Sequence, residues 1–262
     1  FEMVSDHLGD DDEWMWVKGF AEQTGLPVTL VATSAQAYEG NKMYNIAEEA
    51  RAHGMDIRPQ IAGRPTGILH GLTSNFHIFV ASPTFRDKVA TLPLDQRLAA
   101  MQDPAIRAAI LSEDSPLVRA ALGAAAPSDA ALATSLSPGS LLWRIFPLGE
   151  QPDYEPDREG SVAGMAEAAG VSPLEMMYDL LIREGGNELF YQPLGGYVTY
   201  NFDFFSKNMS HPNVLFGLSD GGAHCGVIAD AGMPTFILTH WARDRTKGAK
   251  FPLEFLVRKL TS

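Results

Sequence analysis

The residues with the clearest potential for chemistry lie in the stretch 214–226, VLFGLSDGGAHCG. Apolar residues typical of a buried strand lead directly into Asp220, and His224 follows in a glycine-rich turn. In parallel β/α folds the carboxyl ends of the strands form the functional face, where a carboxylate can bind a metal or accept a proton. On residue types alone, the simpler interpretation is that Asp220 caps the following turn or helix, because a strand leading into Asp-Gly-Gly is common.

The residues around Asp220 supply secondary candidates. His224 is either a metal or substrate ligand or an ordinary turn histidine. Cys225 is expected to be a small buried side chain rather than a nucleophile, because no base lies in register with it. Asp6 and His7 end the first predicted strand and are expected at the same face. Lone histidines such as His53, His70 and His77 are expected to be surface or structural residues.

Further candidates follow the predicted strand 57–62. Gln60 lies near the end of that strand, and Arg64 comes just beyond it, where recognition of a substrate carboxylate would be useful. A structural arginine that binds loop carbonyls explains Arg64 equally well. His240 and Arg243 lie at i and i+3 on one predicted helix, so they face the same way and are candidates for carboxylate binding. The alternative is a helix-packing histidine and a surface arginine.

The elements that position these residues begin with short apolar strands alternating with amphipathic helices. The predicted strands are 2–6, 28–32 and 57–62, and the helices between them begin at the acidic run 10–12 and near residue 43. This order indicates a parallel sheet with right-handed crossovers, and hence an α/β fold.

The alternation is interrupted by residues 63–156, which are rich in Pro, Gly and Ala. We interpret this segment as a helical insertion with short helices at 94–101, 104–111 and 116–122, either a pocket wall or structural padding. A helix with a capping box is predicted at 172–181. The later predicted elements are strands 197–202 and 214–218 and helices 234–242 and 252–260.

Composition excludes several classes of protein. The 262 residues carry a formal net charge of -12, which argues against a nucleic-acid partner. The single cysteine excludes an intrachain disulfide and favours a reducing cytoplasm. No apolar run approaches the roughly 20 residues that span a bilayer, so no membrane partner is expected. Because the sequence starts at Phe1, directly at a predicted strand, we expect that the natural beginning of the protein is missing.

Two segments of the later third resemble the strongest signature of the N-acyl-D-amino-acid deacylases (D-aminoacylases) of the amidohydrolase superfamily. They are residues 213–224, NVLFGLSDGGAH, and 234–245, PTFILTHWARDR. Residues 58–60 and 63–65 resemble an upstream segment of the same group. The resemblance extends over nearly all of the chain, but it is looser in the Ala-rich insertion.

This resemblance implies a partial, TIM-like (β/α) barrel that hydrolyses linear amide bonds in N-acyl-D-amino acids or related compounds. In that family an aspartate at the end of the last barrel strand binds a divalent metal, usually zinc, and acts as the base for the attacking water. Asp220 matches that residue. Zinc lowers the pKa of its bound water towards neutrality and polarises the scissile carbonyl. The expected substrate contacts are His224, Arg64, Gln60 and Arg243.

The sequence departs from the family pattern at the histidine ligands. The family's first ligands are a His-x-His pair, and none occurs in this chain. The matching ends of two middle strands carry Thr33, Ser34, Gln36 and Gln60 instead of histidine. We therefore expect an internal part of a longer protein, which binds zinc weakly by itself.

Two other functional interpretations stay open. The missing histidines favour a non-catalytic binding or assembly relative, whereas the retained turn 219–222 favours an enzyme. A barrel enzyme that uses no metal, with Asp220 as a simple general base, is the third interpretation. Because partial barrels expose strand edges and apolar faces, we also expect homo-oligomerisation.

Overall fold

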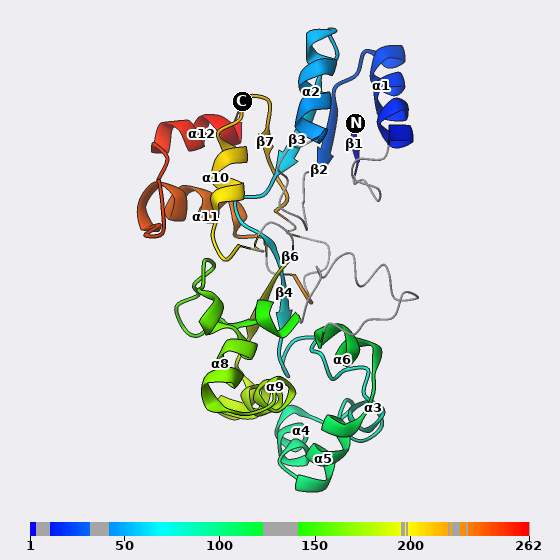
Figure 1. The fold of residues 1–262 in the computed structure, drawn as a ribbon, viewed down its shortest axis with the longest axis vertical. Helices are drawn as coiled ribbons and strands as arrows, with labels where there is room; N and C mark the ends of the chain where they lie inside the picture. Colours follow the sequence, from blue (N-terminus) through cyan, green and yellow to red (C-terminus); the bar gives the residue numbers. More distant parts are fainter. Residues whose placement is uncertain are drawn as a thin grey trace. The chain divides into compact units, whose positions relative to one another are not determined.

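The structure is a computed structural model, and it describes residues 1–3, 11–31, 42–122, 141–194, 197, 199–219, 221, 226–228 and 230–261. The chain divides into two compact units (Figure 1). The first unit comprises Phe1–Pro65, Phe202–Gly221 and Asp230–Ser262, and the second comprises Thr66–Asn201 and Gly222–Ala229. The mixture of helices with a parallel sheet confirms the α/β class, while closure into a barrel stays a prediction.

The first unit is built on a four-stranded parallel sheet with the order β1-β2-β3-β7. Its strands are β1 (Glu2–Met3), β2 (Val28–Val31), β3 (Ile57–Ile61) and β7 (Leu215–Phe216). Its helices are α1 (Asp11–Thr24), α2 (Lys42–Ala52), α10 (Asp203–Met209), α11 (Met233–Thr239), the π-helical η5 (His240–Asp244) and α12 (Leu253–Thr261). The strand predicted at 214–218 is confirmed, but it is shorter than expected.

Helix α1 buries one apolar face. The sequence periodicity predicts Trp14, Val17 and Phe20 as that face, and Trp14 and Val17 are indeed 5% and 1% exposed. Ala21 completes the buried face instead of Phe20. The Phe20 ring is only partly buried and stacks on exposed Trp16, with centroids 5.9 Å apart. Phe20 of α1 therefore belongs to an aromatic group at the surface and not to the core.

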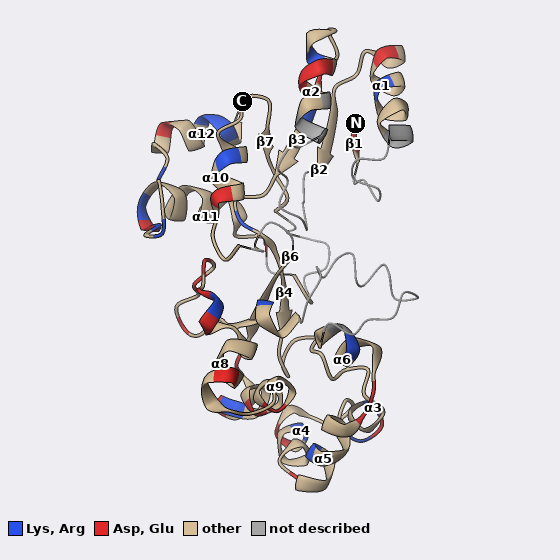
Figure 2. Ribbon diagram, viewed as in Figure 1, with Lys and Arg blue, Asp and Glu red and all other residues tan. Residues whose placement is uncertain are grey.

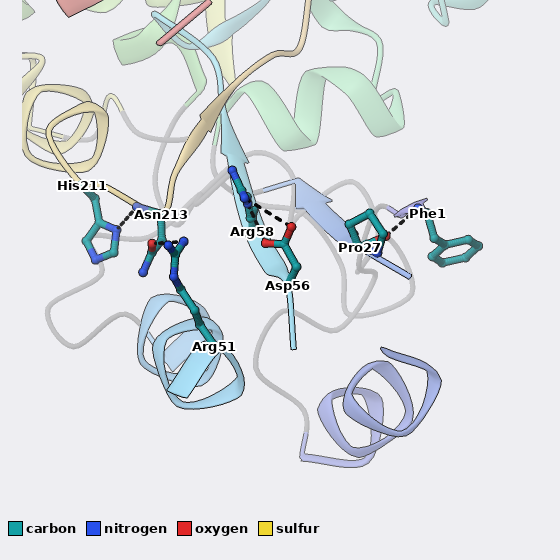
Figure 3. Close-up of polar contacts among 7 residues, drawn as sticks. All are labelled: Phe1, Pro27, Arg51, Asp56, Arg58, His211 and Asn213. Atoms are coloured by element: carbon teal, nitrogen blue, oxygen red, sulfur yellow. Dashed lines mark hydrogen bonds and ion pairs between the residues drawn. The ribbon is translucent and has the colours of Figure 1, made fainter. Parts of the chain in front are cut away.

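Polar contacts join distant parts of the chain at the amino-terminal edge of this sheet (Figure 3). Arg51 of α2 donates to Asn213 Oδ1 at 2.6 Å, and the Asn213 N–H donates to His211 Nδ1 at 3.2 Å. Arg58 of β3 forms a two-point ion pair with Asp56, with N–O distances of 2.7 and 3.2 Å. The first pair of contacts fixes the segment that leads into β7 against α2.

Lys259 of α12 fixes the same segment from the other side. Its ammonium group donates to His211 O at 2.6 Å and to Val214 O at 2.7 Å. Burial, together with the charges of Arg258 and Arg58, lowers the pKa of Lys259. Because these two carbonyls lie just before β7, the contacts place the carboxyl-terminal helix over the start of that strand.

The strand predicted at 197–202 is wrong for the residues that the structure describes. Tyr200 has a φ of 56°, whereas the residues of an extended strand have negative φ values. Phe202 is the N-cap of α10. The buried aromatic residues of this stretch belong to different units. Tyr197 Oη donates to Pro156 O at 2.7 Å in the second unit, whereas Phe202 stacks on Trp241 at 5.7 Å in the first. The apolar pattern therefore marks a passage between units and not one strand.

The second unit contains a three-stranded antiparallel sheet with the order β4-β6-β5. Its strands are β4 (Thr66–His70), β5 (Phe146–Pro147) and β6 (Phe190–Leu194). Its helices are α3 (Pro83–Lys88), α4 (Leu94–Met101), α5 (Pro104–Ser112), α6 (Pro116–Ala121), η2 (Leu141–Arg144), η3 (Arg158–Gly160), α8 (Val162–Ala169), α9 (Pro173–Ile182) and η4 (Arg183–Gly186). The helices predicted inside 63–156 are confirmed to within one residue, and the unit continues beyond that segment to Asn201.

The sequence does not predict the antiparallel strands because they contain glycine and proline. Gly67 of β4 lies against the ring of Tyr191, where an added Cβ would be 1.9 Å from Cε2. Pro193 of β6 pairs with Gly67, beyond the short stretch over which β5 pairs with Phe190 and Tyr191. Proline normally argues against a central strand. It is accommodated in β6 because β5 ends before reaching it.

The helices of both units carry charges of both signs (Figure 2). In α2, for example, Arg51 follows Glu48 and Glu49, and Glu49 accepts a hydrogen bond from Lys18 of α1 at 3.0 Å. Within the part of the chain that the structure describes, no helix is both long enough and apolar enough to cross a membrane.

Two histidines are buried in the core of the second unit. His70 is 0% exposed, and its Nε2 is 2.7 Å from Gln192 Oε1. The His77 ring packs edge-on against Phe85, with centroids 4.5 Å apart. Burial lowers the pKa of His70 to about 4 and that of His77 to about 3, and the charges of His70 and Arg97 lower the pKa of His77 further. Both rings are therefore neutral in the folded protein at neutral pH.

We predict that the protein loses stability as the pH falls from about 6.5 to about 4. Unfolded histidines bind protons below their ordinary pKa of 6.5, whereas the folded rings stay neutral down to about 4 and about 3. Protons therefore stabilise the unfolded state in this window. The free energy of unfolding, measured in urea, should fall by on the order of 1 kcal/mol per pH unit for each histidine.

A double variant tests this assignment. His70→Gln with His77→Phe should flatten the dependence on pH, and His53→Gln, at an exposed position, should leave it unchanged. The same slope in the wild-type protein and in the double variant would show that other groups are responsible.

Candidate functional site

The carboxyl ends of β3 and β7 lie side by side. Gln60 pairs with Leu215 and Ile61 pairs with Phe216, and the Gly217 N–H donates to Ile61 O at 3.0 Å. Because the strands are parallel, both leave the sheet at the same edge. An added Cβ on Gly217 would lie 2.3 Å from Gln60 Cδ. The partly buried Gln60 side chain therefore covers the exit of β7, and glycine at position 217 leaves room for it.

The chain leaves β7 through a strained residue. Leu218 has a φ of 65°, in the left-handed region that costs a residue with a side chain roughly 1–2 kcal/mol. The next residue, Ser219, is exposed. Backbone strain of this kind clusters at functional sites, where the surrounding structure enforces it. The exit of β7 therefore has the local geometry expected of a functional turn.

The strongest candidates from the sequence lie outside the described residues. These are Asp220, His224 and Cys225, together with Asp6, His7, Thr33, Ser34 and Gln36. Among the residues that are described, no group of three or more His, Cys, Asp or Glu side chains is arranged to hold a metal ion. Gln60, the last but one residue of β3, carries a carboxamide, which is not one of the usual zinc ligands. The described donor set therefore does not fit zinc.

Arg64 is buried and paired with a carboxylate. Its side chain is 3% exposed, and Nη1 donates to Oδ1 of Asp230 at 2.7 Å, whose side chain is 1% exposed. Nη1 also lies 3.1 Å from Pro65 O, and the guanidinium group lies over the Phe236 ring, 5.5 Å from its centroid. Of the two interpretations of Arg64, these contacts favour the structural one.

Helix α11 and the π-helical turn η5 pack closely on the residues that follow β3. The Trp241 indole N–H donates to Gly63 O at 2.7 Å. An added Cβ on Gly63 would lie 2.2 Å from Ile237 Cγ1. Glycine is therefore needed for the helix to approach this closely, and residues 61–65 are all buried.

His240 and Arg243, which the sequence places on one helical face, have different surroundings. Both belong to η5, where the regular α-helical spacing is lost. The His240 ring stacks on Phe236, with centroids 4.5 Å apart. The Arg243 side chain is 73% exposed and forms a two-point ion pair with Asp244 at 2.6 and 2.9 Å. Carboxylate binding by Arg243 stays a prediction.

Sequence reasoning missed Asp230 and Leu218. The Asp230 carbonyl accepts the Met233 N–H at 2.9 Å, just before α11. An aspartate shortly before a proline-containing helix start is a recognisable signal, although it does not indicate an arginine partner. Leu218 carries no signal, because leucine rarely adopts a positive φ.

No protein-family model matches the chain, and no match was found among curated proteins or solved structures. The relationship to the N-acyl-D-amino-acid deacylases therefore stays a prediction based on residues 213–224 and 234–245. The geometry at the exits of β3 and β7 is an independent argument for a functional site.

We predict that Leu218→Gly is more stable than Leu218→Ala by about 1 kcal/mol. Both variants remove the side chain, but only glycine adopts the left-handed conformation without strain. Urea denaturation of the two variants measures the difference. Outside such a position alanine is the more stable residue, so equal stability, or a more stable alanine variant, would contradict the strain at Leu218.

Proposed function

We propose that the chain is part of a metal-dependent amidohydrolase that cleaves the linear amide bond of N-acylated D-amino acids or related compounds. In this proposal the first unit belongs to an incomplete (β/α) barrel, and the exits of β3 and β7 form part of its active-site edge. Asp220 is the metal ligand and general base. The partner is a small molecule, and the enzyme is cytoplasmic.

The observation that carries the proposal is the strained exit of β7. Asp220 follows two residues after Leu218, whose left-handed backbone redirects the chain at the carboxyl end of a parallel strand. Enzymes of the β/α class place catalytic carboxylates at such strand ends. A simple capping role for Asp220 needs no strain in the preceding turn. The strain therefore favours a functional role over capping.

The proposed reaction is hydrolysis with Asp220 as a proton carrier. Its carboxylate accepts a proton from water while the water oxygen bonds to the acyl carbonyl carbon. The C–N bond then breaks as the proton passes from Asp220 to the departing nitrogen. The products are a carboxylic acid and a free amino acid, so the step balances without an oxidant or reductant.

The second element of the proposed site is Gln60. Its carboxamide lies over Gly217 at the shared edge and can both donate and accept hydrogen bonds. It therefore suits an amide or acyl oxygen of a substrate. Arg64 is better explained by its ion pair with Asp230, and His224 and Arg243 stay predicted substrate contacts.

The expected zinc depends on residues outside the described part of the chain. Asp220 supplies one ligand in this proposal, and neither Gln60 nor Arg64 is suited to supply another. The chemistry assigned to Asp220 as a base holds with or without the metal. Zinc content is therefore a separate question from turnover.

We predict that Asp220→Asn abolishes amide hydrolysis and leaves the fold intact. Loss of a general base lowers kcat by roughly 100- to 10,000-fold. The measurement is release of free amine from a panel of N-acyl-D-amino acids, with circular dichroism and urea denaturation to check the fold. Asp203→Asn, an exposed aspartate at the start of α10, is the matched control and should retain full activity.

Metal content, measured by mass spectrometry on the dialysed proteins, separates the alternatives. About one zinc per chain that is lost in Asp220→Asn supports the metal-dependent enzyme. Turnover without zinc supports a barrel enzyme in which Asp220 is a simple base. Retained turnover in Asp220→Asn refutes the assignment, and absence of both zinc and turnover favours the non-catalytic binding relative.

Self-association also belongs to the proposal. The face of α1 beside edge strand β1 exposes Met15 and Trp16, whose exposed fractions are 70% and 54%, next to Phe1 at 53%. Apolar side chains grouped in this way are typical of surfaces that are covered in an assembly.

A further inference from the structure

Within the described part of the first unit, six large apolar side chains are between 44% and 70% exposed. They are Phe1, Met15, Trp16 and Leu26, called the α1 patch, and Leu253 and Val257 of α12, called the α12 patch. Single exposed apolar residues are normal on a protein surface, whereas groups of them are typical of surfaces that bind a partner.

The α1 patch borders the edge strand β1. Phe1 directly precedes β1, and its ring contacts the Trp16 ring of α1 edge-on, with centroids 6.2 Å apart. The Phe1 nitrogen donates to Pro27 O at 2.8 Å, and Leu26 is the residue before Pro27 (Figure 3). Phe1 therefore links α1 to the turn before β2. Among the described strands β1 pairs only with β2, so this patch lies at one edge of the sheet.

The α12 patch lies at the other edge of the sheet. Leu253 and Val257 are four residues apart and therefore face the same way on α12. Helix α12 packs on the edge strand β7, and Lys259 fixes it there by donating to Val214 O at 2.7 Å just before that strand. The strand order β1-β2-β3-β7 thus separates the two patches (Figure 1).

The two patches lie in segments of opposite charge (Figure 2). Helix α1 contains four acidic residues and one lysine, which gives a net charge of -3. Residues 247–261 contain four basic residues and one glutamate, which gives a net charge of +3. Exposed Glu22 follows Met15 by two helical turns on the same face of α1, and exposed Arg258 is next to Val257. Acidic groups therefore accompany one patch and basic groups accompany the other.

We propose that the α1 patch of one copy of the chain docks on the α12 patch of a second copy, so that copies associate head to tail. Each patch then buries its apolar side chains against those of the other, and the opposite charges attract across the contact. Pairing of two α1 patches would instead bring like charges together, which opposes association. Because the two patches differ, each contact leaves one patch of each kind unused at the ends, where further copies add. This inference rests on the self-association proposed above and is independent of the proposed reaction.

The test measures the molecular mass of the full chain by analytical ultracentrifugation over a range of concentrations. The mean mass of the wild-type protein should rise with concentration. Met15→Gln with Trp16→Gln removes the α1 patch, and Leu253→Gln with Val257→Gln removes the α12 patch. Each double variant should weaken association roughly 30-fold, as expected for the loss of a central apolar contact. Because the replaced side chains are exposed, circular dichroism and the urea midpoint should stay at their wild-type values.

A mixture of the two double variants distinguishes head-to-tail docking from other arrangements. The α1-patch variant keeps its α12 patch, and the α12-patch variant keeps its α1 patch, so one intact contact forms between them. Equimolar mixing should therefore give a dimer of the two variants that grows no further. Leu122→Gln with Val171→Gln replaces two exposed apolar residues of the second unit, and this matched control should associate like the wild-type protein.

Charge reversal tests the electrostatic part of the contact. Glu22→Lys and Arg258→Glu should each weaken association at low salt, because like charges then meet across the contact. Both changes in one chain should restore part of the association, since the charges are opposite again. Asp87→Lys, at an exposed aspartate of α3 in the second unit, is the matched control and should change nothing.

The wild-type protein and the two patch variants together separate this inference from the proposals around it. A wild-type protein that stays monomeric overturns both the inference and the proposed self-association, even if its α12 patch binds anionic lipid vesicles. Association that is lost in the α1-patch variant but kept in the α12-patch variant supports self-association and overturns head-to-tail docking. Hydrolysis of N-acyl-D-amino acids, measured on the same proteins, decides the proposed reaction separately.

Discussion

The parallel pairing of β3 with β7 is the constraint on which the rest of the first unit depends. It joins Gln60 and Ile61 to Leu215 and Phe216, although residues Thr66–Asn201 of the second unit intervene in the sequence. The pairing is short, so other contacts support it at both ends. Lys259 and the Arg51–Asn213 hydrogen bond hold the segment before β7, and the Gly217–Ile61 hydrogen bond continues the pairing after it.

The edge formed by these two strands combines close packing with features that reduce stability. Glycine at positions 63 and 217 lets a helix and a glutamine side chain approach the backbone. Leu218 adopts a left-handed conformation, and the opposite charges of Arg64 and Asp230 are buried against each other. A sequence selected only for stability has no need of a strained leucine or a buried ion pair. Their occurrence beside the exits of β3 and β7 is the physical reason for proposing a functional site there.

The second unit is stabilised in a different way. Its helices and antiparallel strands surround a core that includes aromatic rings, among them Tyr178, whose Oη donates to Met101 O at 2.9 Å and whose pKa is raised to about 12 by burial. His70 and His77 are part of this interior as neutral rings. Their burial makes the stability of the unit depend on protons, although neither ring belongs to the proposed site.

Local patterns predicted much of the secondary structure. The helix at 94–101 and the capping-box helix at 173–182 have start signals and apolar spacing that act over a few residues, and both are confirmed. Strand 197–202 was wrong because its aromatic residues pack in two different units, which spacing along the chain does not reveal. Strands β4 and β6 were missed because they contain Gly67 and Pro193, which are unusual in a sheet. Gly67 is accommodated by the Tyr191 ring that packs on it, and Pro193 by the shortness of the neighbouring strand β5.

The same distinction applies to the candidate site. The sequence by itself determined the α/β class, the strand that leads to Asp220, and Gln60 and Arg64 as residues at a strand end, because these depend on local periodicity and residue chemistry. Only the tertiary structure decided that Gln60 covers Gly217, that Leu218 is strained and that Arg64 is paired with Asp230. Each of these is a contact or conformation imposed by chain segments far apart in sequence, and such long-range contacts leave no periodic signal in the residues that make them.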